Sequence, residues 1–130
     1  MEEAEKGMQV ILLVEDEPLL SALLKQRLEK EGYAVLRTGD GEEALALLKK
    51  EVPNLILLDI ILPKMSGFEF MERLREDPQI PSIPIVITSN LGQETDIEKG
   101  KKLGAVGYFV KARISIEDLI AQVKSYLNQN

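Results

Sequence analysis

The sequence alternates short, continuous apolar segments with longer segments in which apolar residues recur every three or four positions. The short segments are residues 9–14, 34–38, 55–59, 83–88 and 107–110. They are rich in Val, Ile and Leu, as β-strands are, whereas the longer spacing is typical of amphipathic helices. Runs such as ILLV and LILL are continuous, so we expect strands buried on both faces. The pattern predicts an α/β fold, (βα)5, whose parallel sheet carries helices on both faces.

The residues that punctuate the helical segments agree with this prediction. Pro18 suits the first turn of a helix, where its missing N–H is not needed. Residues 40–43 and 66–69 resemble capping boxes, and residues 115–118 are a weaker variant. The pair Asp77-Pro78 is expected to end the third helix, and Gly104 the fourth.

Composition narrows the chemistry that such a chain can perform. The 130 residues include no cysteine and no histidine, which excludes disulfides, thiolate or imidazole metal ligands and Ser-His-Asp catalysis. The net charge of −6 argues against a nucleic-acid-binding face. No signal peptide or membrane-spanning run is present, so we expect a cytoplasmic protein. Residues 1–7 are expected to form a flexible tail and residues 8–128 a single domain, with no output domain after it.

Acidic residues follow two of the predicted strands. Asp59 comes directly after LILL, and no helix that it could cap begins nearby; Glu15 and Asp16 end the first strand. Taken alone, Asp16 could equally be a solvated acid before a helix. In an open parallel sheet of strand order 2-1-3-4-5, however, the first and third strands are neighbours and their carboxyl ends share one edge. We therefore expect Glu15, Asp16 and Asp59 to lie close together.

Three neighbouring carboxylates raise one another's pKa values unless a cation lies among them. With oxygen ligands only, the expected ion is a hard one, and Mg²⁺ fits best. Thr88 and Lys111 end the fourth and fifth strands and so reach the same edge. Taken alone, Thr88 would be interpreted as an ordinary strand residue and Lys111 as a solvated lysine. Together with the carboxylates they suit an oxyanion with several charged oxygens, above all a phosphoryl group.

The segments ILLVEDEP, LILLDIILPKMSG, IVITSN and GYFVKA resemble, in order and spacing, the receiver domains of two-component response regulators. The resemblance covers residues 9–127 and implies the flavodoxin-like receiver fold. It implies these site residues: Asp59 as phosphoacceptor, Asp16 as direct Mg²⁺ ligand, Glu15 acting mainly through water, the Ile61 carbonyl as a further ligand, Thr88 as switch hydroxyl, Lys111 as phosphate partner and Tyr108 as the aromatic that changes rotamer.

The same resemblance implies a mechanism. Asp59 would take a phosphoryl group from a histidine kinase or a histidine phosphotransfer protein in a Mg²⁺-dependent step. The protein would catalyse only its own phosphorylation and slow dephosphorylation, and would not be an enzyme in the usual sense. The face made by the fourth helix, fifth strand and fifth helix would then change conformation and signal to a downstream protein. A monomer or weak dimer without nucleic-acid or membrane binding is expected.

Two departures from the family pattern matter. Ala112 follows Lys111 where the family usually has proline, often with a cis bond; we expect a trans bond and a differently shaped loop. Ile61 and Asn90 occupy positions that tune hydrolysis of the phosphoryl group in the family. An apolar Ile61 cannot orient an attacking water, so we expect a long-lived phosphoryl group.

Other readings of the sequence remain open. A pseudo-receiver would share the fold and work only as a phosphorylation-independent interaction module. A flavodoxin-like protein would bind a cofactor at the same sheet edge. The segment from Gly39 to Ala44, GDGEEA, nearly matches a dinucleotide fingerprint, but its acids would repel a pyrophosphate.

Overall fold

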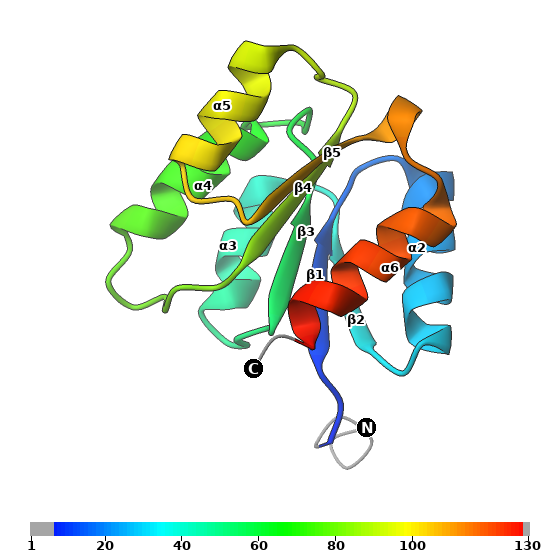
Figure 1. The fold of residues 1–130 in the computed structure, drawn as a ribbon. Helices are drawn as coiled ribbons and strands as arrows, with labels where there is room; N and C mark the ends of the chain where they lie inside the picture. Colours follow the sequence, from blue (N-terminus) through cyan, green and yellow to red (C-terminus); the bar gives the residue numbers. More distant parts are fainter. Residues whose placement is uncertain (1–6, 129–130) are drawn as a thin grey trace.

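The computed structural model describes residues 7–128 and shows a five-stranded parallel sheet of order β2-β1-β3-β4-β5 (Figure 1). In chain order the elements are β1 (Val10–Val14), α2 (Pro18–Lys30), β2 (Ala34–Thr38), α3 (Gly41–Leu48), β3 (Leu55–Leu58), α4 (Gly67–Glu76), β4 (Ile85–Ser89), α5 (Glu94–Lys102), β5 (Gly107–Val110), η1 (Lys111–Arg113) and α6 (Ile116–Leu127). The predicted (βα)5 fold and strand order are confirmed. The flexible tail predicted for residues 1–7 lies outside the described residues except for Gly7, which is exposed.

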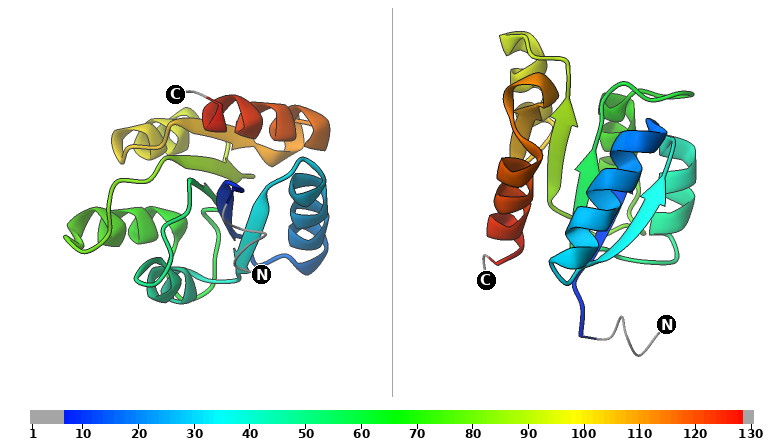
Figure 2. Two further views of the ribbon diagram at one scale, coloured as in Figure 1. Left: turned by 90° about the horizontal axis from the view of Figure 1, so that it is seen from below. Right: turned by 90° about the vertical axis from the view of Figure 1, so that its right-hand side faces the viewer.

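Helices cover both faces of the sheet, as Figure 2 shows: α2 and α6 on one side, α3, α4 and α5 on the other. Side chains along one strand alternate between two apolar cores. Leu12 and Leu58 pack in the core under α3 and α4, whereas Leu13 and Leu57 pack in the core under α2 and α6. The continuous apolar runs of the sequence are therefore strands buried on both faces, as predicted.

The predicted caps are present, but only half of each predicted capping box forms. The N-cap bonds run from Glu43 N to Asp40 Oδ1 (2.8 Å), from Glu69 N to Ser66 Oγ (3.1 Å) and from Asp118 N to Ser115 Oγ (3.0 Å). The second bond of a capping box, from the N-cap N–H to the glutamate, was predicted at Asp40 and Ser66 and is absent at both. Each glutamate accepts a hydrogen bond from another donor. Glu43 accepts from Gly39 N, one residue further back, and Glu69 pairs with Arg73 one turn along α4.

Strand and helix ends differ little from those predicted. The third predicted helix, α4, ends at Glu76, before Asp77-Pro78, and Gly104 follows α5 with a φ of 108°, as expected for a glycine that closes a helix. β4 begins at Ile85, because Pro84 has no N–H for the ladder, and it includes Ser89. Ser89 is thus the last residue of β4, at the sheet edge where the site lies.

Within residues 7–128 no helix is both long and apolar enough to cross a bilayer.

The loop after β3 is pressed against the strand that it leaves. Gly67 N donates a hydrogen bond to Ile60 O (2.7 Å), and a Cβ at position 67 would lie 2.5 Å from Asp59 O. Only glycine therefore allows α4 to begin so close to the end of β3. The start of α4 and the backbone of Asp59 are positioned by the same contact.

We predict that Gly67→Ala destabilises the protein, although helix propensity alone favours alanine by about 1 kcal/mol. The new methyl group would meet backbone atoms of Asp59 and Ile60, and overpacking of this kind costs about 1–3 kcal/mol. Urea unfolding measures the change. Gly39→Ala is the matched control, because its Cβ would have nothing closer than an Arg37 nitrogen at 3.7 Å. Equal stability of the two variants would contradict the prediction.

Candidate functional site

Three carboxyl groups meet at the carboxyl edge of the sheet, as predicted. One oxygen from each of Glu15, Asp16 and Asp59 lies within 4.8 Å of the others. The convergence follows from the pairing of β1 with β3, which sets Val14 beside Leu58 and so brings the residues that follow them together. Glu15 and Asp59 are buried and Asp16 is exposed. The acids therefore form a site with two buried carboxylates and one at its mouth.

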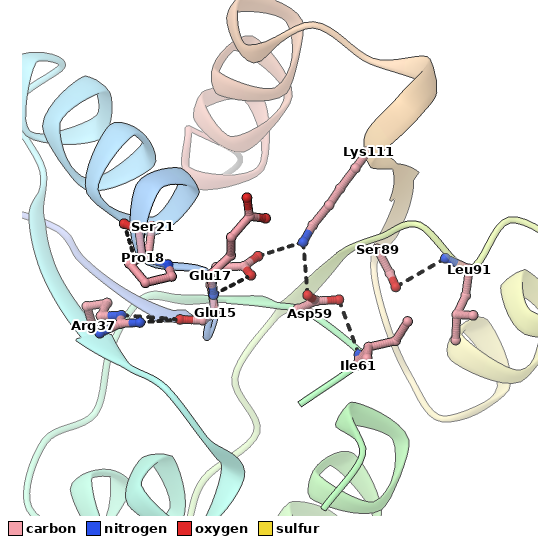
Figure 3. A network of polar contacts seen from close by, with 10 residues as sticks. All are labelled: Glu15, Glu17, Pro18, Ser21, Arg37, Asp59, Ile61, Ser89, Leu91 and Lys111. Atoms are coloured by element: carbon pink, nitrogen blue, oxygen red, sulfur yellow. Dashed lines mark hydrogen bonds and ion pairs between the residues drawn. The ribbon is translucent and has the colours of Figure 1, made fainter. Parts of the chain in front are cut away.

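Lys111 bridges the two buried carboxylates (Figure 3). Its Nζ lies 2.8 Å from Glu15 Oε1 and 2.9 Å from Asp59 Oδ2. The contact with Asp59 is a hydrogen bond and the contact with Glu15 is a close ion pair; Glu15 Oε1 is buried and has no other donor among residues 7–128. Lys111 is thus part of the site and not a solvated strand end.

Backbone groups hold the carboxylates in place. Ile61 N donates to Asp59 Oδ1 (3.2 Å), and Glu17 N donates to Glu15 Oε2 (3.1 Å). Arg37, at the end of β2, donates from Nε and Nη2 to the carbonyl oxygen of Glu15 at 3.2 and 2.9 Å. Arg37 was not predicted as a site residue. Its position near the end of β2, the strand that pairs with β1 and sets Arg37 beside Leu13, could have indicated it.

The pKa values of the buried groups reflect this crowding. Burial raises the pKa of Glu15, and the nearby Asp59 adds to that rise, while Lys111 opposes it. Burial lowers the pKa of Lys111, but its contacts with Glu15 and Asp59 raise it by more, so the net shift is upward. The ammonium group is therefore held in its charged form, and three carboxyl groups face one cation.

This donor set can hold a metal ion. It offers carboxylate oxygens only, which favours a hard divalent cation over a softer one. Glu15 Oε1, which is buried and has Lys111 as its one partner among residues 7–128, is an oxygen that such an ion or its bound water could also contact. The backbone carbonyl of Ile61, also assigned to the ion from the family resemblance, stays a prediction.

The structure separates the two predicted switch residues. Side chains alternate along β4: Val86 packs in the core under α2 and α6, and Ile87 packs in the other core, against which Tyr108 lies. Thr88 accordingly faces the α2–α6 side, where it lines a cavity of about 60 Å³ with Leu20, Ile114 and the stem of Lys111, among others. Thr88 and Tyr108 therefore lie on opposite faces of the sheet, and the switch role expected for Thr88 stays a prediction. The fourth strand extends one residue beyond its predicted end, to Ser89.

Ser89 is the hydroxyl on the same side as Tyr108. It is fully buried, and its Oγ accepts a hydrogen bond from Leu91 N (3.3 Å), as Figure 3 shows. The hydroxyl of Tyr108 donates to Leu91 O (2.6 Å), so both side chains bind the backbone of one residue. Leu91 also lines a hollow together with Ile61, whereas the predicted partner of Ile61, Asn90, is exposed and does not line it.

Two loops near the site bear on the peptide bond expected before Ala112 and on the dinucleotide fingerprint considered at residues 39–44. No cis peptide bond occurs within residues 7–128, which confirms the trans bond expected before Ala112; Lys111–Arg113 forms a short 3-10 turn. At the start of α3, the Asp40 carboxylate already accepts the Glu43 N–H. An anion of the chain itself therefore occupies the position that a dinucleotide pyrophosphate would need.

Comparison with known proteins gives consistent results. The family model of the response regulator receiver domain matches residues 11–124. The phosphate regulon transcriptional regulatory protein PhoB of Rhizobium meliloti is 40% identical over 119 residues, which are 92% of this chain and 52% of PhoB. Protein PilH of Pseudomonas aeruginosa is 35% identical over 117 residues, which are 90% of this chain and 96% of PilH. The chain thus spans about half of PhoB and nearly all of PilH.

A solved structure also resembles this one closely. The CheY-like response regulator receiver domain protein from Methanospirillum hungatei superimposes with a TM-score of 0.84 at 30% sequence identity. The match covers 94% of this chain and 95% of that protein.

We predict that Lys111→Met lowers the free energy of unfolding by roughly 3 kcal/mol, because it leaves two buried carboxylates without their cation. In an Asp59→Asn background the same substitution should cost clearly less, since one of the two carboxylates is gone. Urea unfolding of the four proteins in EDTA measures this coupling. Lys124→Met is the control, because its ion pair with Glu31 is exposed to solvent and should contribute little to stability. Additive costs of the two substitutions would contradict the prediction.

Proposed function

The chain belongs to the response regulator receiver domain family, and from that premise we propose that Asp59 accepts a phosphoryl group from a histidine kinase or histidine phosphotransfer protein. One observation carries the proposal: a buried aspartate bound to a lysine ammonium, with two more carboxylates within 4.8 Å. A cluster of this kind is costly to build for structure alone. It is suited to an acceptor whose product carries additional negative charge.

In the transfer step one carboxylate oxygen of Asp59 attacks phosphorus in line with the leaving nitrogen of the donor histidine. A P–O bond forms, the P–N bond breaks, and the imidazole leaves with the bonding electron pair. The product is an acyl phosphate. Lys111 Nζ, already 2.9 Å from Asp59, can pair with a phosphoryl oxygen without a large movement. The protein accelerates its own modification and turns over no separate substrate.

We assign Mg²⁺ as the ion of this site, held by Asp16 and Asp59 directly, by Glu15 mainly through water and by the Ile61 carbonyl. When bound, the ion supplies charge neutralisation for the phosphoryl oxygens. The contribution of the chain is to place its carboxylates before the donor arrives. Arg37 and the Glu17 N–H hold Glu15, and the Ile61 N–H holds Asp59.

Ser89 takes the role of the switch hydroxyl in this proposal. In the structure Ser89 Oγ is bound to Leu91 N and Tyr108 OH to Leu91 O. A phosphoryl oxygen on Asp59 would draw the serine hydroxyl away from Leu91. Tyr108, whose ring lies against Gly100 so closely that a Cβ there would be 2.9 Å from it, would follow into the space. The face made by α5, β5 and α6 would then repack and signal to a downstream protein.

The phosphoryl group should be long-lived. Ile61 is 57% exposed and shares a hollow with Leu91 beside the site. Neither side chain can hydrogen-bond a water and direct it at phosphorus. Hydrolysis is therefore left to water that the protein does not orient, and general acid–base help worth about 10²–10⁴-fold is absent from these two positions.

Phosphorylation itself is the central test. The protein is incubated with Mg²⁺ and acetyl phosphate, and its intact mass is measured. We expect the addition of one phosphoryl group, lost in Asp59→Asn and after addition of EDTA. Asp118→Asn is the control, because that aspartate lies in the first turn of α6 and is exposed. It should accept the group as the wild type does.

Two results would count against the proposal. A folded wild-type protein that takes up nothing in Mg²⁺ would be a phosphorylation-independent interaction module. Uptake that survives Asp59→Asn would place the acceptor elsewhere. Loss of the group within seconds of removing the donor would refute only its proposed long lifetime.

A separate experiment distinguishes the two candidate switch hydroxyls. Ser89→Ala and Thr88→Val should both accept the phosphoryl group, since neither residue is the acceptor. Only Ser89→Ala should lose the phosphorylation-dependent shifts of backbone amides in α5 and β5, because only Ser89 shares Leu91 with Tyr108. ¹H–¹⁵N NMR spectra before and after acetyl phosphate measure these shifts. The opposite ranking of the variants would return the switch role to Thr88.

A further inference from the structure

A hollow of about 380 Å³ opens between α4 and α5, at the amino end of β4 and so at the opposite edge of the sheet from Asp59. Its volume falls within the range of small-molecule sites, roughly 300–1,000 Å³. Leu74, Ile80, Ile83, Ile85 and Leu103 form much of its wall. Figure 1 shows α4 and α5 on the same side of the sheet.

The apolar core is less completely covered here than elsewhere. Leu74 and Ile80 are each 7% exposed, Ile83 is 8% exposed and Ile85 is 6% exposed. In the same core, Leu12 and Ile56 are 0% exposed. These large aliphatic side chains keep a small exposed area that faces the hollow, and an apolar ligand would remove that area from water.

Two cations that form no ion pair within the described part of the chain border this hollow, although Glu72 and Glu76 lie near Arg75, and Glu98 lies near Lys102. Arg75 and Lys102 are its only charged lining residues, and no carboxylate lies within 4.0 Å of either among residues 7–128. Arg73, two positions before Arg75 on α4, is by contrast paired with Glu69 at 2.8 Å. The chain has 22 acidic and 16 basic residues, so carboxylates are abundant. The rim of this hollow therefore carries two exposed cations that the structure does not pair with a carboxylate.

We propose that this hollow binds a small anionic amphiphile, with a single carboxylate on an unbranched apolar chain. The apolar chain packs on the isoleucine and leucine wall, and the carboxylate bonds to Arg75 and Lys102 at the rim. An arginine guanidinium can engage both carboxylate oxygens at once, and a lysine adds a point charge. The site is separate from Asp59, so binding does not require phosphorylation.

Decanoate is the probe, used below its micelle concentration with ¹⁵N-labelled protein. We expect saturable shifts of backbone amides in residues 71–85 and 100–105, and at least tenfold weaker binding of decan-1-ol. Arg75→Gln and Lys102→Gln should each weaken binding about tenfold, the size expected for one charge-assisted hydrogen bond. Ser82→Phe, at an exposed lining position, should block the hollow without disturbing the fold.

Matched variants control for charge and for the phosphorylation site. Arg73→Gln and Lys101→Gln each remove a cation close in sequence to Arg75 or Lys102, but neither Arg73 nor Lys101 lines the hollow. Both should bind decanoate within about twofold of the wild type. Asp59→Asn should bind it equally well, which separates this proposal from the proposed function.

Three outcomes would overturn the proposal. The first is that decanoate shows no saturable binding. The second is that the Arg75→Gln and Lys102→Gln variants bind decanoate as tightly as the wild type does. The third is that the backbone amide shifts map to residues outside the hollow. A short peptide that combines glutamate and leucine serves as a further arm. If it binds more tightly than decanoate, the hollow is a docking surface for protein and not a small-molecule site.

Discussion

The contact of Lys111 with two buried carboxylates is the constraint on which the site depends. Burying Glu15 and Asp59 together is unfavourable, because each must leave water beside a like charge. One ammonium group, 2.8 and 2.9 Å away, offsets part of that cost and leaves the cluster with an excess of carboxyl groups. This excess of carboxyl groups suits the edge of the sheet to a cation and couples its charge balance to any change at Asp59.

The fold holds this arrangement through the backbone rather than through more side-chain charges. Pairing of β1 with β3 places the acidic turn beside Asp59, and Arg37 reaches from β2 to the carbonyl of Glu15. Gly67 lets α4 begin against the end of β3. A rigid parallel sheet buried on both faces therefore carries a small set of charged groups at its edge.

Helix α5 extends from the contact with Tyr108 to the hollow at the opposite edge of the sheet. Its only buried residue is Gly100, which packs against Tyr108. Its last residue, Lys102, borders the hollow at the other edge. A helix anchored by so little apolar surface can shift at modest cost, which suits the face that is proposed to change on phosphorylation. The same sparse packing against α4 leaves the hollow open.

The sequence alone determined the fold class, the predicted N-caps and, given the common strand order 2-1-3-4-5, the residues that meet at the sheet edge. Those features depend on local periodicity and on the rule that parallel strands end at one edge. It did not determine whether Thr88 or Ser89 faces Tyr108. In a strand buried on both faces every residue is apolar, so the pattern lacks the alternation that would assign each side chain to a face. The bond from Arg37 to Glu15 and the hollow between α4 and α5 likewise join residues far apart in the chain. Only the packing of the helices on the sheet, which follows from the shapes of all the side chains together, decided them.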